Sequence, residues 1–427
     1  MATERRLKSK MKKCDPENFT IHDFLGECKK ADAADTRFEK GAEQGKASNN
    51  LFVEGVPPIK LGNLYRNVSG LLGSEKGWSK KNDDNGRFHL ILGGARGSGI
   101  PFKRFAQLFK WDYGITPHCN YFRGHVWLTH KVKLIQTLRQ AELENLVPES
   151  YLFFPGSSED NETDGFRVAC ESGAKRAVSN KCWIVKASDA SRGERTLISE
   201  DFDEIMNHLD SVEKSSAAWC VQRYISNPLL LPGGKKFDLR FLVLVDRDLD
   251  AYVCSQAICK TCSSKFSMDN LTDKMAHLST AAIQRGSSDT MPIEQFSKWL
   301  SSEHSQSFES AVATPARQII AKVLSAAKEK LENVDHADFT SFQVFAFDFI
   351  LDNDLKLWLL ESSTPTDIPE DIVDEVAKDV FDIAINPVFA EAADEGRSAG
   401  KPSSGKIFEK LEVRTRRRSN NSSSNKK

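Results

Sequence analysis

Two acidic residues, Asp348 and Glu361, interrupt an otherwise apolar stretch that runs from Phe342 to Ser363. Carboxylates on a largely apolar pair of strands are costly to desolvate unless a cation or hydrogen-bond donors compensate them. Two hard oxygen donors at hairpin-pair distance suit Mg²⁺ that is bound together with substrate phosphates. The alternative is that one acid lies in water at a strand end and the other belongs to an ordinary ion pair.

This stretch predicts a β-hairpin that turns at Asp352-Asn353-Asp354. If the loop has two residues, Asp348 lies opposite Leu359. Because side chains alternate between the two faces of a strand, Glu361 and Ser363 then share the face of Asp348. The other face is expected to seal a core, through Phe345, Phe347, Phe349, Trp358 and Leu360.

A second predicted strand, Lys235–Val245, carries three charges on one face, because Lys236, Asp238 and Arg240 are two residues apart. The strand ends in the apolar run FLVLV, which favours a functional site over a solvated edge. The mixed signs can satisfy one another and still leave positive charge for phosphate or carboxylate. The opposite face carries the apolar Phe237, Leu239 and Phe241.

A lysine and a loop of small residues end a third apolar strand, Lys181–Lys186. The backbone N–H groups of such a loop, Ala187–Glu194, can wrap phosphate oxygens, and Lys186 adds a point charge. One glycine and one lysine are a weak signal on their own. A further apolar strand, Ala218–Ile225, offers a backbone edge that could hold a base.

Further elements must position these groups. Strands are predicted at His89–Gly94 and Tyr151–Pro155, a loop at Gly156–Gly165, and helices at Leu128–Leu138, at Glu200–Leu209 with Ser199 as cap, from Thr314 as cap with Pro315, and from Pro369.

The bulk composition limits the possible classes of partner. With 427 residues, about three domains or two larger ones are expected. Lys+Arg 59 and Asp+Glu 60 cancel, so no overall field points to nucleic acid or membrane. No apolar run is long enough to span a bilayer, and the basic first residues lack the apolar segment of a secretory signal. Nine cysteines with a lone CxxC, Cys259 and Cys262, favour reduced thiols over a metal site.

Taken together and in this order, several segments resemble successive motifs of the tubulin–tyrosine ligase family, a branch of the ATP-grasp ligases. They are NYFRG, WIVKAS, SRGE, CVQRYISNPLLL, KKFDLRFLVLV, HLS, SFQVFAFDFILD and LWLLES. The similarity runs from about Leu51 to Leu411. It implies an α/β fold of ATP-grasp type, with antiparallel sheets and flanking helices around a nucleotide cleft, preceded by a smaller N-terminal domain.

The resemblance also implies boundaries. The expected parts are a mobile extension (1–50), an N-terminal domain (51–128), a central ATP-grasp domain (129–223), a C-terminal ATP-grasp domain with the Mg²⁺ site (224–395) and a basic disordered tail (396–427).

The resemblance gives roles to individual residues. Those expected to bind ATP are Lys131 and Lys186 at the phosphates, Ser188 in the loop that folds over them, Gln222, Tyr224 and Ile225 at the adenine, and Lys236. Those expected to hold Mg²⁺ are Asp348, Glu361 and Ser363. Catalysis is assigned to Asp238, Arg240 and Glu361, and substrate binding to Arg123, Arg240 and Lys260.

Three departures from the family pattern fall among these motifs. Ser363 replaces an asparagine, so the Mg²⁺ site is expected to be one amide oxygen short. Ser255 aligns with an arginine that grips a carboxylate, and Lys260 can supply charge there but no bidentate fork. Thr280 also stands in place of an asparagine. The pattern points to altered or lost activity.

The resemblance implies an ATP- and Mg²⁺-dependent ligase that adds tyrosine, through an acyl phosphate, to the C-terminal carboxylate of detyrosinated α-tubulin. Its partners would be the α-tubulin tail of the αβ dimer and a free amino acid, with neither nucleic acid nor membrane. It would act as a monomer in the cytoplasm, on the microtubule cytoskeleton.

Two alternatives stay open. One is a non-catalytic protein that binds tubulin tails. Six retained charged residues favour an enzyme instead; they are Lys186, Lys236, Asp238, Arg240, Asp348 and Glu361. The other is a ligase for another amino acid, such as glutamate. The short basic tail argues against that second alternative, because it offers no long domain for docking on the microtubule lattice.

Overall fold

The computed structural model describes residues 50–54, 60–81, 88–94, 99–100, 102, 116–154, 161–173, 181–188, 190, 193–211, 218–284, 290–332, 339–365, 368–390 and 405–412. The chain from residue 49 onward forms one compact unit. Residues 1–49 of the predicted extension (1–50) lie outside the described residues. The tail predicted from residue 396 contains a strand, β17 (Phe408–Leu411), which pairs with β11 (Ala251–Cys254). The prediction missed this strand because four residues give a short pattern.

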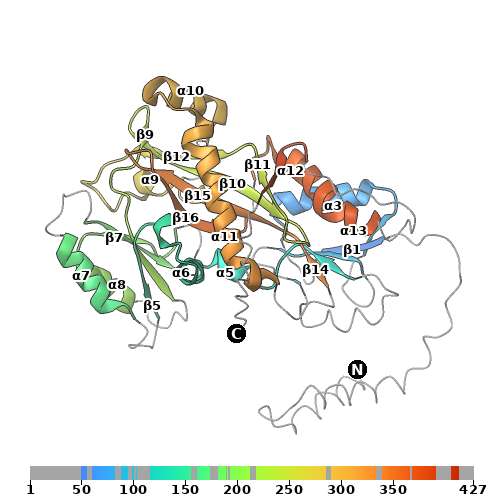
Figure 1. Cartoon of the computed structure of the whole chain (residues 1–427), viewed down its shortest axis with the longest axis horizontal. Coiled ribbons are helices and arrows are strands. Elements are labelled where there is room, and N and C mark those ends of the chain that lie inside the picture. Colours follow the sequence, from blue (N-terminus) through green and yellow to red (C-terminus); the bar gives the residue numbers. More distant parts are fainter. Residues whose placement is uncertain are drawn as a thin grey trace, which may run out of the picture. The chain divides into compact units, whose positions relative to one another are not determined.

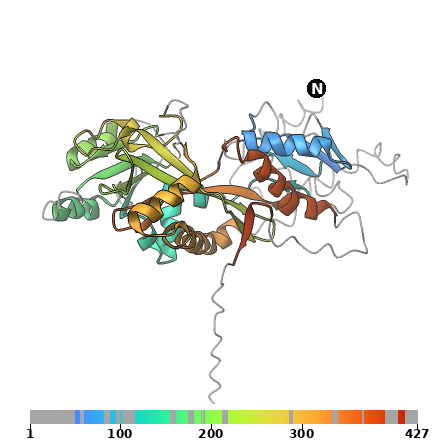
Figure 2. The same ribbon diagram turned by 90° about the horizontal axis from the view of Figure 1, so that it is seen from above.

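One sheet consists of parallel strands in the order β14-β4-β3-β1-β2. Its strands are β1 (Asn50–Glu54), β2 (Trp78–Lys81), β3 (Leu90–Leu92), β4 (His118–Cys119) and β14 (Thr340–Ser341). The helix α3 (Asn63–Ser74) lies between β1 and β2 in the chain and buries Leu64, Val68 and Leu72 at helical spacing. It lies beside α12 (Val373–Val380), although the two are far apart in sequence (Figure 2).

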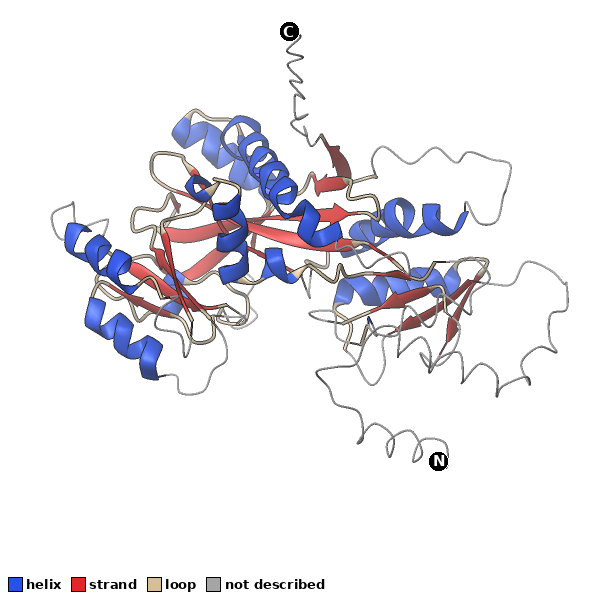
Figure 3. Cartoon of the chain, turned by 60° about the horizontal axis from the view of Figure 1, so that its bottom comes forward, coloured by secondary structure: helices blue, strands red, loops and turns tan. Residues whose placement is uncertain are grey.

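A second, antiparallel sheet has the order β5-β8-β6-β7, with β5 (Ser150–Phe153), β6 (Trp183–Ala187), β7 (Leu197–Ser199) and β8 (Trp219–Arg223). The helices α7 (Thr163–Gly173) and α8 (Phe202–Ser211) pack on one face of it (Figure 3), where Phe166 and Ile205 meet Trp183. The predicted cap of α8 was wrong by two residues. Asp201 accepts a hydrogen bond from the Glu204 N–H, while Ser199 ends β7.

The largest sheet is antiparallel and is built around β10 (Lys235–Val245), whose bounds are those predicted for this strand. β10 pairs with β15 (Gln343–Leu351) on one side and with β12 (Ile258–Lys265) and β11 on the other. β15 also pairs with β16 (Leu357–Ser363). The sheet is completed by β9 (Leu230–Leu231), β13 (Thr290–Met291) and β17.

The two faces of β10 and β15 have different surroundings, as their alternation predicts. One face is covered by α10 (Ile293–His304) and α11 (Thr314–Glu332), as Figure 1 shows. That core contains Phe237, Leu239, Phe241, Phe345, Phe347 and Phe349. On the opposite face, Leu242, Leu244, Val344 and Ala346 share a core with α3 and α12.

The hairpin has a longer loop than predicted. β15 ends at Leu351 and β16 begins at Leu357, because the Asp352 carboxylate accepts hydrogen bonds from the Asp354 and Lys356 N–H groups and from Trp358 Nε1.

The register therefore differs, and Asp348 lies directly opposite Glu361 instead of Leu359. The register also shifts by one residue on β16 between Leu359 and Glu361. Leu357 and Leu359 consequently fill the core, and the prediction of Trp358 and Leu360 there was wrong.

Other helices differ in their bounds from the predictions. The helix predicted at Leu128–Leu138 is two helices, α5 (Val126–Thr129) and α6 (Lys131–Gln140), separated by extended backbone at His130. Thr314 is no cap, because a π-helical turn, Glu309–Ala313, leads directly into α11. The short helix α9 (Lys274–His277) follows β12, and α12 continues through a π-helical turn into α13 (Asn386–Ala390). No helix within the described ranges has the length and apolar character to cross a membrane.

Candidate active site

A cavity of about 1100 Å³ is bounded by residues of the second sheet and by the polar end of β10 and β15. The cavity lies on the face of β10 and β15 that is opposite the α10–α11 core. At this end of the two strands that face carries charged side chains, whereas further along it carries Leu and Val. Predicted residues that line the cavity are Lys131, Lys186, Ser188, Gln222, Tyr224, Ile225, Lys236, Arg240, Lys260, Thr280, Asp348, Glu361 and Ser363.

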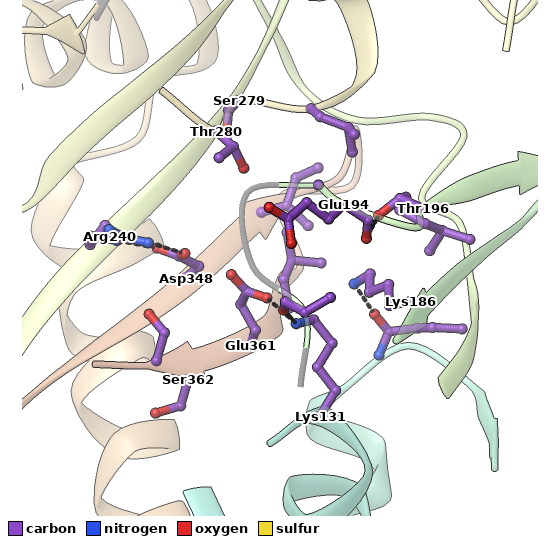
Figure 4. A pocket seen from close by; sticks show the side chains of 18 of the residues that line it. Lys131, Lys186, Glu194, Thr196, Arg240, Ser279, Thr280, Asp348, Glu361 and Ser362 are labelled. Atoms are coloured by element: carbon purple, nitrogen blue, oxygen red, sulfur yellow. Dashed lines mark hydrogen bonds and ion pairs between the residues drawn. The ribbon is translucent and has the colours of Figure 1, made fainter. Parts of the chain in front are cut away.

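Asp348 lines the cavity and is paired with two cations, of which Figure 4 shows Arg240. Its oxygens accept hydrogen bonds of 2.8 and 2.7 Å from Nε and Nη2 of Arg240, and Lys260 Nζ lies 3.0 Å away. Burial alone would raise the pKa of Asp348, but the charges of Arg240 and Lys260 outweigh it and hold the pKa well below its ordinary value. The carboxylate is therefore ionised although only 3% of the residue is exposed.

Glu361, opposite Asp348, is paired more loosely. Its Oε2 lies 3.5 Å from Lys131 Nζ, which also donates a 2.9 Å hydrogen bond to the carbonyl of Ala190. The Glu361 side chain is one-third exposed, so it retains free lone pairs on the cavity side. Beside it, the buried Ser362 hydroxyl has no hydrogen-bond partner among the residues that the structure describes.

The predicted phosphate side is held by β6, β8 and the start of α6. Lys186 Nζ donates a 2.9 Å hydrogen bond to Gln222 Oε1, and burial lowers the pKa of Lys186. The Ser188 hydroxyl accepts a hydrogen bond from the Val132 N–H at the first turn of α6. An ammonium with one neutral partner is well suited to an incoming anion.

Two buried networks fix the wall formed by β10 and the segment after α9. Asp238 accepts hydrogen bonds from Lys236 Nζ, at 3.3 Å, and from the Ser279 hydroxyl. The hydroxyl of Tyr224 lies 2.8 Å from Nδ1 of His277. Since the other ring nitrogen of His277 faces the carbonyl of Asn270 and must donate to it, Nδ1 accepts a hydrogen bond from the Tyr224 hydroxyl.

Three predicted residues do not line the cavity. Asp238 lies just behind its wall, where it orients Lys236. Arg123 is exposed in the turn before α5, two residues before the cavity residue His125. Ser255 is exposed after β11, and its N–H donates to the Ile407 carbonyl.

Ser255 therefore supplies no group to the cavity lining, and its alignment with the carboxylate-binding arginine of the family stays a prediction. β12 presents its charge to the site through Lys260, which lies opposite Asp238 in the β10–β12 ladder and forms its ion pair with Asp348 of β15. Sequence reasoning gave no role to several cavity residues, among them Thr196, Ser279 and Ser362 (Figure 4). His125 also lines the cavity without a predicted role. Thr196 carried no local signal, because a hydroxyl in a loop is common, whereas Ser279 lies in the motif HLS but received no role of its own.

The arrangement around Lys186 makes a prediction about nucleotide binding. We expect Lys186→Ala to lower nucleotide affinity at least tenfold, or about 1.4 kcal/mol, because a cation of the phosphate side is lost. Calorimetry with ATP measures this change. An unchanged affinity would remove Lys186 from the phosphate site, and Lys298→Ala, on the outer face of α10, serves as control.

Comparison with known families decides the relationship of the chain. Residues 112–394 match the tubulin-tyrosine ligase family. The chain belongs to this family. The resemblance derived from the sequence motifs is confirmed, and with it the α/β fold of ATP-grasp type, in which antiparallel sheets and helices surround the cavity.

Similar members of the tubulin-tyrosine ligase family have names that refer to other amino acids than tyrosine. The chain is 25% identical to "Probable tubulin polyglutamylase ttll-9" of Caenorhabditis elegans over 314 residues, which are 70% of this chain and 72% of that protein. It is 25% identical to "Probable tubulin polyglutamylase TTLL9" of Bos taurus over 57% of this chain and 61% of that protein. It is 26% identical to "Tubulin glycylase 3B" of Tetrahymena thermophila over 49% of this chain but only 18% of that protein.

Proposed function

We propose that the chain is an ATP- and Mg²⁺-dependent ligase that joins glutamate to a carboxylate of an acidic tubulin tail. The observation that carries this proposal is the convergence of cations from separate strands and a helix on the Asp348–Glu361 pair. Lys131 comes from α6, Lys186 from β6, Arg240 from β10 and Lys260 from β12. Such a set of fixed cations stabilises the charge that is spread over a transferring phosphoryl group.

The reaction requires two steps in the same cavity. In the first step, an acceptor carboxylate oxygen attacks the γ-phosphorus of ATP. This attack forms an acyl phosphate, and ADP leaves. The amine of the incoming amino acid then attacks the acyl carbon, phosphate leaves, and the amine loses a proton. Lys186 and Lys131 would hold phosphate oxygens, while Arg240 and Lys260 would orient the carboxylates.

The residues fit a Mg²⁺ ion of the kind that shares its ligands with a nucleotide. Asp348 and Glu361 are hard oxygen donors that face each other on adjacent strands, and Mg²⁺ is commonly held by one or two carboxylates plus phosphates. Each carboxylate has about four lone-pair sites, so Asp348 can serve Mg²⁺ beside Arg240 and Lys260. When bound, the ion would neutralise phosphate charge during transfer.

The charge of the cavity favours glutamate over tyrosine. Cationic lining residues outnumber the acids Glu194, Asp348 and Glu361; they are Lys131, Lys186, Arg223, Lys236, Arg240 and Lys260. A glutamate side chain adds a carboxylate that needs such a cation, whereas a tyrosine needs an apolar slot. The names of the two polyglutamylase relatives support the same choice. We therefore prefer the glutamate alternative to the tyrosine reading.

One observation favours a second candidate, a non-catalytic protein that binds tubulin tails. Both oxygens of Asp348 are already bound by Arg240 and Lys260, and Ser363 lacks the amide of the family pattern. In this case the cavity would bind nucleotide and peptide without turnover. We propose cytoplasmic action on microtubules for either candidate.

Incorporation of labelled amino acids into purified tubulin tests the proposal. With ATP and Mg²⁺, we expect labelled glutamate to be incorporated in preference to tyrosine and glycine, and Glu361→Gln to abolish incorporation. Preferred incorporation of tyrosine would restore the first reading. Tubulin binding without any incorporation would favour the non-catalytic candidate.

Substitution of Ser363 is predicted to improve function. It lines the cavity on β16, opposite Ala346. Ser363→Asn supplies an amide oxygen one carbon further from the backbone, so we expect higher ligase turnover or tighter Mg²⁺–ATP binding. Turnover at several Mg²⁺ concentrations measures this. A lower activity would mean that the serine is a specialised part of this site.

A further inference from the structure

Two lysine ammonium groups lie against one indole ring on the surface where α5, α6 and α11 meet. Lys133 Nζ is 4.0 Å and Lys330 Nζ is 4.4 Å from the ring centroid of Trp127. All three side chains are partly exposed. We call these three residues the Trp127 patch.

The positive charge of the Trp127 patch is not neutralised within the described part of the chain. Lys330 donates hydrogen bonds to Thr137 Oγ1 and Gln140 Oε1, which are both neutral acceptors. No carboxylate there forms an ion pair with Lys133 or Lys330, and an aromatic ring attracts cations without carrying a net charge. Partial burial, and then the nearby charge of Lys133, lower the pKa of Lys330. The two like charges are therefore held together against their mutual repulsion.

The position of the patch relates it to the cavity. Trp127 lies in the middle of α5, a single turn whose flanking residue His125 and last residue Thr129 line the cavity. A peptide that entered the cavity along α5 would pass Trp127. Its preceding residues, at about 3.3 Å each when extended, come within reach of Lys133 and Lys330.

We propose that the Trp127 patch binds acidic side chains of the peptide segment next to the residue that is modified in the cavity. This inference rests on the function proposed for the cavity and adds a second contact for the same substrate. Carboxylates are the groups that satisfy the chemistry of the patch, because they neutralise both ammonium groups while the indole ring packs against the peptide. The patch thus selects for acidic sequence around the acceptor residue.

Binding of two labelled peptides, one with a run of glutamates and one with glutamines instead, tests this inference by fluorescence anisotropy without turnover. We expect the double variant Lys133→Gln/Lys330→Gln to bind the glutamate peptide about tenfold more weakly, which is about 1.4 kcal/mol. Its affinity for ATP should stay unchanged, and its binding should depend less on salt. Lys133→Arg/Lys330→Arg keeps the charge and should keep the affinity.

A control of equal charge removes two exposed lysines elsewhere, in Lys298→Gln/Lys322→Gln on the outer sides of α10 and α11. Equal weakening by both double variants would overturn the proposal, since net charge alone would then explain binding. Unchanged binding by Lys133→Gln/Lys330→Gln would also overturn it, while the ligase function would still stand. If the wild-type chain binds ATP but incorporates no amino acid, the proposed function fails, and the peptide data still decide the role of the patch.

Discussion

Replacing Arg240 by methionine is expected to lower the free energy of unfolding by about 3 kcal/mol, because it leaves a buried carboxylate without its bidentate partner. Asp348 would keep only Lys260, at 3.0 Å, while its burial would no longer be offset by two charge-assisted hydrogen bonds. The same change should remove ligase activity. Urea unfolding followed by fluorescence measures the loss of stability, and glutamate incorporation measures the loss of activity.

The pH dependence of this loss follows from the pKa of Asp348. Since the folded-state pKa is held below its ordinary value, the pair contributes fully above the unfolded-state pKa of about 4. The contribution is lost as the pH falls through the lower folded-state pKa. The difference in stability between wild type and Arg240→Met should therefore be constant near neutrality and shrink below about pH 4.

Two comparisons isolate the pair from a general loss of charge. Arg317→Met removes an arginine that pairs with exposed Glu309 and Glu409, and should cost less than about 1 kcal/mol. Asp348→Asn should cost less in the Arg240→Met background than in the wild type, because the two residues are coupled. If Arg240→Met costs no more than Arg317→Met, the buried pair does not hold Asp348.

Local periodicity predicted which residues share a face, because alternation in a strand depends on the backbone alone. The charged face of Lys236, Asp238 and Arg240 and the apolar face with Phe237 could therefore be predicted before any tertiary contact was known. The fold class followed from the family motifs, which are local patterns as well. The parallel sheet could not be predicted in this way, because its strand β14 pairs with β4, where Thr340 lies opposite His118 and the two are far apart along the chain.

The register and the pairing of charges could not be predicted from the sequence. The hairpin register depends on the Asp352 carboxylate, which closes a loop longer than two residues, and on the shift before Glu361. Lys260 reaches Asp348 only because β12 pairs with β10, which is a tertiary contact. For the same reason, the sequence named Lys260 as a source of charge but could not show that its partner is Asp348.

Asp379 holds the C-terminal strand, and its removal should have an effect of similar size. The residue is 2% exposed on α12, and its oxygens accept hydrogen bonds from the N–H groups of Lys406, Ile407 and Phe408. These bonds fix the segment that enters β17, the strand that pairs with β11 at the edge of the largest sheet. The side chain ties residues far apart in the sequence without a disulfide or a metal.

Asp379→Ala leaves these N–H groups without an acceptor, two of them buried, and each buried unpaired group costs about 1–3 kcal/mol. We expect a loss of about 4 kcal/mol in total. The amides of β17 should exchange faster with solvent than those of β10, because the edge strand detaches first. Hydrogen exchange followed by mass spectrometry and urea unfolding measure the two effects.

Asp382→Ala provides the control for Asp379→Ala, since Asp382 is a surface acid that pairs with Lys378 at helical spacing and should contribute less than about 1 kcal/mol. Gly405→Ala tests the same contact from the other side. A Cβ at residue 405 would clash with Asp379 Oδ2, so the carboxylate would have to move away from its donors. Both Asp379→Ala and Gly405→Ala should release β17. If only Asp379→Ala does so, the effect comes from the packing of α12 and not from the hydrogen bonds to the strand.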